Sequence, residues 1–325
     1  MNVRTPTGVT VDVPRLTKNW GDVGEETSDI QTTVDVRAPT LLDGRLQGLE
    51  FEYDVSLNDV YVASAEASQV DVKPDGTRLD LTAAFQHDRV PDWWKTHVDN
   101  DETTTLQVEP RLNLDVDGLL DLGLPLTDLK FRAPQVRREF ETDVLGGVRD
   151  SAPQKRTVLG REVIRIHEID AAWSKPTEDE TPVEVTADVE NPTRIPMAFD
   201  DVRYEIRMND VVVGEGTAAD ELRLPARSQR EVEFQPAIQT ERLVDWWPTH
   251  VENDEETQLD VRVYAEVGPS PLSKSITLYR HRDTVETDVV TGESRRLTEA
   301  LAPEAEVEGA AAGRPNAADE GVASD

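Results

Sequence analysis

The residues best suited to chemistry lie in a phrase that the chain contains twice. Residues 92–102 read DWWKTHVDNDE, and residues 245–255 read DWWPTHVENDE, 153 positions later. Each copy places a histidine, His97 or His250, just before a run of carboxylates. Imidazole nitrogens and carboxylate oxygens bind divalent cations, and oxygen-rich loops suit Ca²⁺ or Mg²⁺. The phrase is therefore the first candidate for a metal or catalytic site.

The spacing within the phrase argues against a metal. It lacks the twelve-residue pattern of a calcium loop, and neither copy offers a second histidine. The alternative is a histidine at a helix end followed by an acidic, solvated turn, where a cationic side chain suits the helix dipole. We expect this second arrangement, and we predict no metal ion and no cofactor.

The usual signatures of enzymes do not converge anywhere in the chain. It contains no glycine-rich phosphate loop and no Gly-x-Ser-x-Gly elbow. It has no cysteine, which excludes disulfides, thiolate zinc sites and cysteine nucleophiles. Gly214 and Gly216 lie inside an apolar run and are expected at a β-bulge rather than in a cofactor loop. The sequence predicts a protein that is not an enzyme and has no catalytic residues.

A short helix is expected to carry each phrase. The first phrase follows Pro91, which favours the first turn of a helix, and its apolar residues recur at helical spacing. On either side, apolar and polar residues alternate, most clearly over residues 49–57, as in antiparallel strands with one wet face. Asn58-Asp59 and Asn209-Asp210 each separate two such strands. They predict tight hairpin turns, because Asn and Asp tolerate positive φ.

The duplication extends well beyond the phrase. Trp20 and Trp173 are also 153 positions apart, so the repeat unit is a whole domain. Six to seven short strands with turn signals between them predict an antiparallel β-sandwich for each unit. We expect the first sandwich over residues 1–145, a linker over 146–157 and the second sandwich over 158–290. Residues 291–325 lack a strand period and are expected to form a disordered acidic tail.

Four of the six tryptophans lie in the two phrases: Trp93, Trp94, Trp246 and Trp247. Burying an indole removes a large apolar area from water, so we expect one ring of each pair to close the open end of its sandwich and the other to cover the rim. The alternative is an exposed aromatic patch for a client protein or an apolar ligand. These four residues are the possible interaction patch.

The charge of the chain is strongly negative. It has 66 acidic and 34 basic residues, a net charge of −32, and only seven of the basic residues are lysine. At about 1 M salt the Debye length is about 3 Å, so self-repulsion is screened there. We interpret the chain as halophilic, with hydrated cations on its acidic surface; the alternative is an ordinary acidic protein. Nucleic acid is not expected as a partner, because its binding requires Lys and Arg.

The sequence also bears on location. No stretch approaches the roughly 20 apolar residues of a membrane span. Residues 1–6 lack the apolar core of a signal peptide. We expect a cytoplasmic protein; the alternative is a membrane-anchored one, if the true start lies upstream.

Several motifs together resemble a known family. They are the Trp-Gly turn at Trp20, the Asn191-Pro192 strand end, the hairpins that end in Asn-Asp, and the duplicated phrase. The pattern resembles the water-stress and hypersensitive-response (WHy) domain of late embryogenesis abundant type 2 proteins, in the tandem form seen in haloarchaea. The resemblance covers about residues 9–290. Repeat one departs from it with Ala38-Pro39 in place of Asn-Pro.

The resemblance implies a function as well as a fold. It implies fibronectin-type-III-like or immunoglobulin-like sandwiches, each with one short helix, and no catalytic residues. It also implies a protective role in desiccation and osmotic stress, in which the protein hydrates and shields or binds other macromolecules. The alternative is an interaction or adhesion module that docks a partner through a sheet edge or through the Trp-Trp end. Client proteins and self-association through an edge strand are both expected as possible partnerships.

Overall fold

A computed structural model describes residues 2–4, 10–37, 46–73, 75–115, 128–132, 136–158, 160–267 and 274–290. The tail expected over 291–325 lies outside these residues. All strand pairings are antiparallel, and they form four sheets. Each sheet draws its strands from one repeat.

The first repeat forms two sheets, with the orders β1-β2-β3-β6 and β5-β4-β7-β8; β9 also pairs with β7. A 3₁₀ turn, η2 (His87–Arg89), leads into the helix α1 (Val90–Asp99) between β6 and β7. The strands are β1 (Asn2–Arg4), β2 (Thr10–Val23), β3 (Thr27–Arg37), β4 (Leu46–Leu57), β5 (Val60–Val72), β6 (Thr77–Gln86), β7 (Thr103–Asp115), β8 (Asp128–Arg132) and β9 (Val136–Glu141).

The second repeat has the same plan, with the orders β10-β11-β12-β15 and β14-β13-β17-β18; β16 also pairs with β12. The turn η4 (Thr240–Arg242) leads into the helix α3 (Leu243–Glu252). The strands are β10 (Gln154–Val158), β11 (Arg161–Trp173), β12 (Glu180–Asn191), β13 (Met197–Met208), β14 (Val211–Leu224), β15 (Ser228–Phe234), β16 (Ala237–Gln239), β17 (Glu256–Val267) and β18 (Lys274–Glu286).

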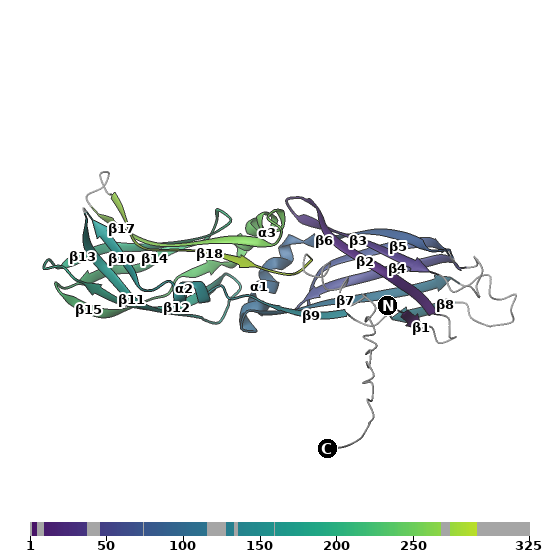
Figure 1. The fold of residues 1–325 in the computed structure, drawn as a ribbon, viewed down its shortest axis with the longest axis horizontal. Helices are drawn as coiled ribbons and strands as arrows, with labels where there is room; N and C mark the ends of the chain where they lie inside the picture. Colours follow the sequence, from purple (N-terminus) through teal and green to yellow (C-terminus); the bar gives the residue numbers. More distant parts are fainter. Residues whose placement is uncertain are drawn as a thin grey trace, which may run out of the picture.

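The fold class predicted from the sequence is confirmed as all-β sandwiches with short helices. Alternate residues of a strand are buried, as in β12, because one face of each sheet packs into a core and the other faces water. The two sandwiches lie end to end, with α1 and α3 between them (Figure 1). The core is continuous from one sandwich to the other through these helices.

The predicted hairpin turns have the expected backbone. Asn58 and Asp59 have φ of 48° and 65°, and Asn209 and Asp210 have φ of 48° and 64°. Positive φ at both central residues matches the right-handed twist of the flanking strands. The pairing of β13 with β14 shifts register between Ile206 and Arg207, next to Gly214, so the bulge predicted there is confirmed.

The expected linker is more ordered than a plain connection. Residues 146–150 form the short helix α2 (Gly146–Asp150), which packs on β11 and β18. Residues 154–158 form β10, which pairs with β11 and so adds an edge strand to the second sandwich. The chain between the repeats is therefore packed against the second repeat.

Candidate functional site

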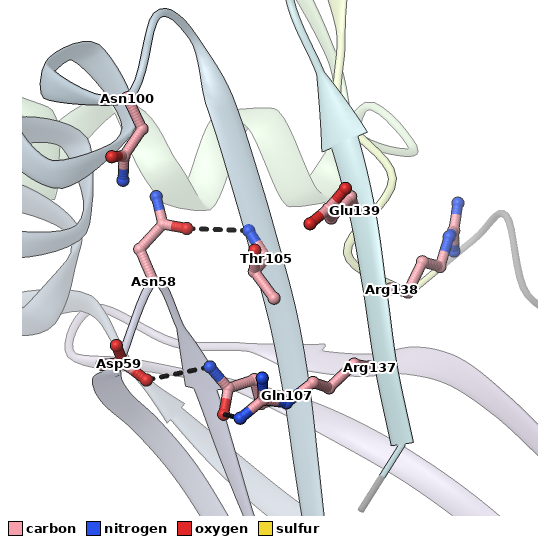
Figure 2. Close-up of a pocket in the computed structure, with 8 residues that line it drawn as sticks. All are labelled: Asn58, Asp59, Asn100, Thr105, Gln107, Arg137, Arg138 and Glu139. Carbon is pink, nitrogen blue, oxygen red and sulfur yellow. Dashed lines mark hydrogen bonds between the residues drawn. The ribbon is translucent and has the colours of Figure 1, made fainter.

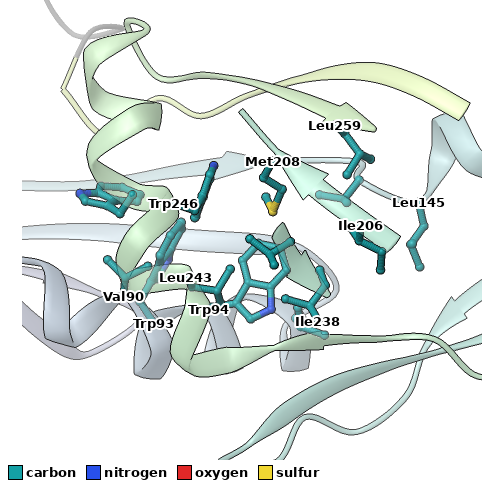
Figure 3. Packing of buried hydrophobic residues seen from close by; sticks show 14 of the residues in the cluster. Val90, Trp93, Trp94, Leu145, Ile206, Met208, Ile238, Leu243, Trp246 and Leu259 are labelled. Atoms are coloured by element: carbon teal, nitrogen blue, oxygen red, sulfur yellow. The ribbon is translucent and has the colours of Figure 1, made fainter. Parts of the chain in front are cut away.

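The two copies of the phrase meet in the middle of the molecule. Helices α1 and α3 contact each other, and the indoles of Trp93, Trp94, Trp246 and Trp247 are at most 3 % exposed. Figure 3 shows three of these rings among the aliphatic side chains that surround the helices. The expected patch is therefore covered, each pair of rings by the other repeat, and it presents no exposed aromatic surface.

The aromatic contacts across this interface are reciprocal. The ring centroids of Trp20 and Trp247 lie 6.3 Å apart, and those of Trp173 and Trp94 lie 5.9 Å apart. Shifting either pair by 153 positions gives the other. The pairs Trp94–Trp246 (6.3 Å) and Trp93–Trp247 (5.4 Å) are related in the same way. All six tryptophans thus form one cluster, with the isologous geometry of a two-fold dimer interface inside a single chain.

A buried glutamate from each phrase ties the two repeats together. The indole Nε1 of Trp173 donates to Glu102 Oε1, and Nε1 of Trp20 donates to Glu255 Oε1, both at 2.8 Å. Glu102 Oε2 also accepts from the Val144 amide (2.6 Å). Each carboxylate is thus shared between a tryptophan of the other repeat and the backbone that follows its own last strand. We call these two groups the glutamate clasps.

The second clasp is built in the same way as the first. Glu255 Oε1 accepts from the Val290 amide at 2.7 Å, and Glu255 Oε2 accepts from the Val289 amide at 3.0 Å. The side chain of Glu255 is 1 % exposed and that of Glu102 is 6 % exposed. The expected acidic, solvated turn is therefore wrong for these two residues, although Asp99, Asp101 and Asp254 are exposed.

The turn geometry explains why one carboxylate turns inward. Asp101 and Glu102 have φ of 52° and 59°, and Asp254 and Glu255 have φ of 55° and 65°. Two successive left-handed residues reverse the chain after the helix and aim the second side chain at the interface. Such residues are rarely left-handed without a local reason, and the amides and indole held by the carboxylate supply it.

The histidines of the phrase are locked in neutral form. Trp93 Nε1 donates to Thr104 Oγ1 at 2.9 Å, so the Thr104 hydroxyl proton is left for His97 Nδ1, 2.8 Å away. Thr142 Oγ1 donates to Glu102 Oε2 at 2.9 Å, so His97 Nε2 carries a proton and donates to Thr142, at 2.9 Å. Both ring nitrogens are thereby used.

The second histidine repeats the arrangement. His250 Nδ1 lies 2.8 Å from Thr257 Oγ1, which accepts from Trp246 Nε1, and His250 Nε2 lies 2.8 Å from Thr287 Oγ1. Burial lowers the pKa of His97 and of His250 to about 4, because the cationic ring would lose its hydration. A neutral, buried imidazole with both nitrogens hydrogen-bonded is a structural element rather than an available base or metal ligand. Within the described ranges, no group of three His, Cys, Asp or Glu side chains is arranged to hold a metal ion.

The two halves differ at one pair of tryptophans. Trp94 Nε1 donates to Thr181 Oγ1 at 3.2 Å. The position equivalent to Thr181 is Ser28, which is instead 2.8 Å from His87 Nε2. As a result, Trp247 Nε1 is buried with no hydrogen-bond partner among the described residues. The indole N–H of Trp94 therefore has a hydrogen-bond acceptor in the other repeat, whereas the equivalent N–H of Trp247 has none among the described residues.

This difference predicts unequal effects of the same substitution. Trp94→Phe leaves the fully buried Thr181 hydroxyl without its donor, whereas Trp247→Phe removes an N–H that has no partner. We expect Trp94→Phe to lower the free energy of unfolding by about 1 kcal/mol more than Trp247→Phe. Urea unfolding of the two variants measures the difference. Equal losses in the two variants would show that the Thr181 bond contributes nothing.

Two polar hollows lie beside the hairpin turns, one in each repeat. The hollow in repeat one has a volume of about 530 Å³, and Figure 2 shows that side chains from the Asn-Asp turn, β7 and β9 line it. Asn58 Oδ1 accepts from the Thr105 amide at 2.7 Å, and Gln107 donates to Asp59 at 2.9 Å. The equivalent hollow beside Asn209 has a volume of about 340 Å³. These polar groups brace the turn against the neighbouring strand.

Two comparisons with known proteins found similarities. The family model described as late embryogenesis abundant protein matches residues 186–280, in the second repeat, and supports a family of that type. A crystal structure of a protein from Archaeoglobus fulgidus is similar, with 22% identity and a TM-score of 0.33; the alignment covers 38% of this chain and 98% of that one. No curated protein matches the chain. No helix in the described part is long and apolar enough to cross a membrane.

Proposed function

We propose that the chain is a non-enzymatic protein that protects other macromolecules when water is scarce. The match of residues 186–280 to the late embryogenesis abundant model carries the proposal. The finer assignment, tandem WHy domains of the haloarchaeal type, rests on the motifs of both repeats. The phrase supports a structural role, because its histidines are neutral and its glutamates hold the two sandwiches together.

The surface suits this role in a salt-rich cytoplasm. Exposed carboxylates hold water and hydrated cations, and the chain has 66 acidic residues and a net charge of −32. The clasps fix the two sandwiches against each other, so the acidic surface stays in place while solvent is withdrawn. Clients are shielded by this hydrated surface or bound to it.

Deleting the gene tests the proposal in the cell. We expect the deletion strain to lose viability on drying and on hypo-osmotic shock, and the reintroduced gene to restore it. Purified protein dried with a desiccation-sensitive enzyme should preserve more activity than an equal mass of serum albumin. Unchanged survival together with no preservation of the enzyme would reject the proposal.

The alternative function is a docking module that uses a sheet edge. One observation favours it: β14 ends its sheet in the described structure, and Ile195, in the turn before β13, is 71 % exposed. The Trp-Trp end is covered by the other repeat, so the edge is the available surface. Recovery of one stoichiometric partner from unstressed cells, lost in Ile195→Asp, would favour this function over protection.

A further inference from the structure

The second sandwich encloses an apolar cavity of about 90 Å³ between its two sheets. Its walls are side chains such as Ile166, Val185 and Val263. The only side-chain hydroxyls among the lining residues belong to two tyrosines, and both are hydrogen-bonded elsewhere. Tyr204 accepts from the Ala237 amide at 3.1 Å, and Tyr279 lies 2.8 Å from Ser151 Oγ. A water molecule needs two to four polar partners, so this cavity favours an apolar occupant.

Part of the cavity lining comes from two strands that do not pair with each other. Its lining includes Ala218 and Leu222 of β14 and Val232 and Phe234 of β15, all partly exposed. These strands are the neighbouring edges of the two sheets. These side chains are partly exposed and Ala218 is small, so this edge is the route by which the cavity can open to water. An elongated molecule can therefore enter between the sheets without disturbing a hydrogen-bonded ladder.

Two of the residues that line the cavity are smaller than their equivalents in the first repeat. Val202 lines the cavity in repeat two, and its equivalent in repeat one, 151 positions earlier, is Phe51. The Phe51 ring lies 6.1 Å from the ring of Tyr53, the equivalent of Tyr204. Likewise Ala187, another lining residue, has Val34 as its equivalent. Repeat two thus carries the smaller side chain at these two lining positions, and the larger one at Phe234 and Val185, whose equivalents are Leu81 and Thr32.

We propose that the cavity binds the end of an unbranched hydrocarbon chain, with the polar head of that ligand in water at the β14–β15 mouth. A dry cavity of about 150 Å³ accepts benzene or xenon, and 90 Å³ suits a slimmer group such as the last carbons of an alkyl chain. Each methylene that enters the cavity adds a favourable contribution, because apolar area is removed from water. Polar ligands are excluded, because the lining offers no free donor or acceptor to replace water.

Titration of the full-length protein tests the proposal. Octanol and octanoate have the same hydrocarbon chain length and differ in the polar head group. Xenon has no head group, so its binding reports only on the apolar cavity. We expect one saturable site for octanol by calorimetry, competition between octanol and octanoate, and a saturating shift in the ¹²⁹Xe resonance. A protein that binds neither octanol nor xenon would overturn the proposal, whatever variants later show.

A pair of variants locates the site. Val202→Phe introduces the ring that repeat one already carries, and we expect it to weaken octanol binding at least tenfold and to abolish the xenon shift. Thr217→Phe places the same ring on an exposed position of β14, and binding should stay within twofold of the unaltered protein. Melting temperatures check that both variants fold. Octanol binding that survives unchanged in folded Val202→Phe would also overturn the proposal.

The proposal goes beyond the protective function and is separable from it. Protection rests on the acidic surface, so Val202→Phe should preserve a dried enzyme as well as the unaltered protein does. Failure to bind octanol would leave protection standing.

Discussion

Acidification from pH 7 to pH 4 is expected to lower the free energy of unfolding by about 3 kcal/mol for each of His97 and His250. Both side chains are buried, and burial lowers the pKa of each to about 4, against about 6.5 in the unfolded chain. The combined loss is comparable with the whole stability of many domains, which is about 5–15 kcal/mol.

The direction follows from proton binding. Above pH 6.5 both histidines are neutral in the folded and unfolded chains, so they add no pH dependence. Between pH 6.5 and 4 the unfolded chain takes up protons that the folded chain does not, and stability falls as the pH falls. Below about pH 4 the folded histidines protonate too, and their contribution levels off. The slope near pH 5 is about 1.4 kcal/mol per pH unit for each histidine.

Urea unfolding at a series of pH values measures this slope. The experiment belongs in molar potassium chloride, where screening suppresses the change in surface repulsion that accompanies acidification. In His97→Gln, the slope between pH 6 and 5 should fall by up to half, because His250 and His87, whose pKa values burial also lowers, keep their shares; the variant is less stable at every pH. His250→Gln should lower the slope by a similar amount, because its ring is buried and hydrogen-bonded in the same way. A slope unaffected by His97→Gln would contradict the assignment.

Much of the fold could be predicted because it rests on local patterns. Period-two alternation marks β3, β4 and β12, and Asn-Asp with positive φ marks the turns. The 153-residue offset predicts that both halves share one plan. Less predictable was the linker, because two adjacent glycines indicate flexibility, whereas Gly146 and Gly147 lie in α2 where a Cβ would collide with Asp143 and Asp283.

The interface could not be predicted from the phrase alone. Period and hydrophobicity show that Trp94 and Trp247 are buried, but they do not show by what, because the residues that cover them belong to the other repeat. A signal was nevertheless available: Trp20 and Trp173 keep the same 153-residue offset as the phrase although they lie far from it in sequence. The burial of Glu102 and Glu255 had no such signal, since four acidic or amide residues in a row look like a solvated turn.

The glutamate clasps predict a large loss of stability when one carboxylate oxygen of Glu255 is replaced by an amide nitrogen. In Glu255 both carboxylate oxygens accept N–H groups, from Trp20 and Val290 at Oε1 and from Val289 at Oε2. Glu255→Gln turns one of these acceptors into an NH₂ group that faces a donor, in a site that is 1 % exposed. Hydrogen bonds to a charged group contribute about 1.5–3 kcal/mol, and a buried unsatisfied donor costs about 1–3 kcal/mol. We expect the variant to lose about 3 kcal/mol of stability.

The matched control is Glu252→Gln, three residues earlier in the same phrase, where the side chain is exposed and the loss should stay within about 0.5 kcal/mol. Glu102→Gln should behave like Glu255→Gln, because Glu102 accepts from the Trp173 indole, the Val144 amide and the Thr142 hydroxyl. Since each clasp joins the two sandwiches, the double variant should unfold in two steps, one for each sandwich, when followed by circular dichroism. A double variant that unfolds in one step, with no more loss than Glu252→Gln, would show that the tryptophan cluster alone holds the repeats together.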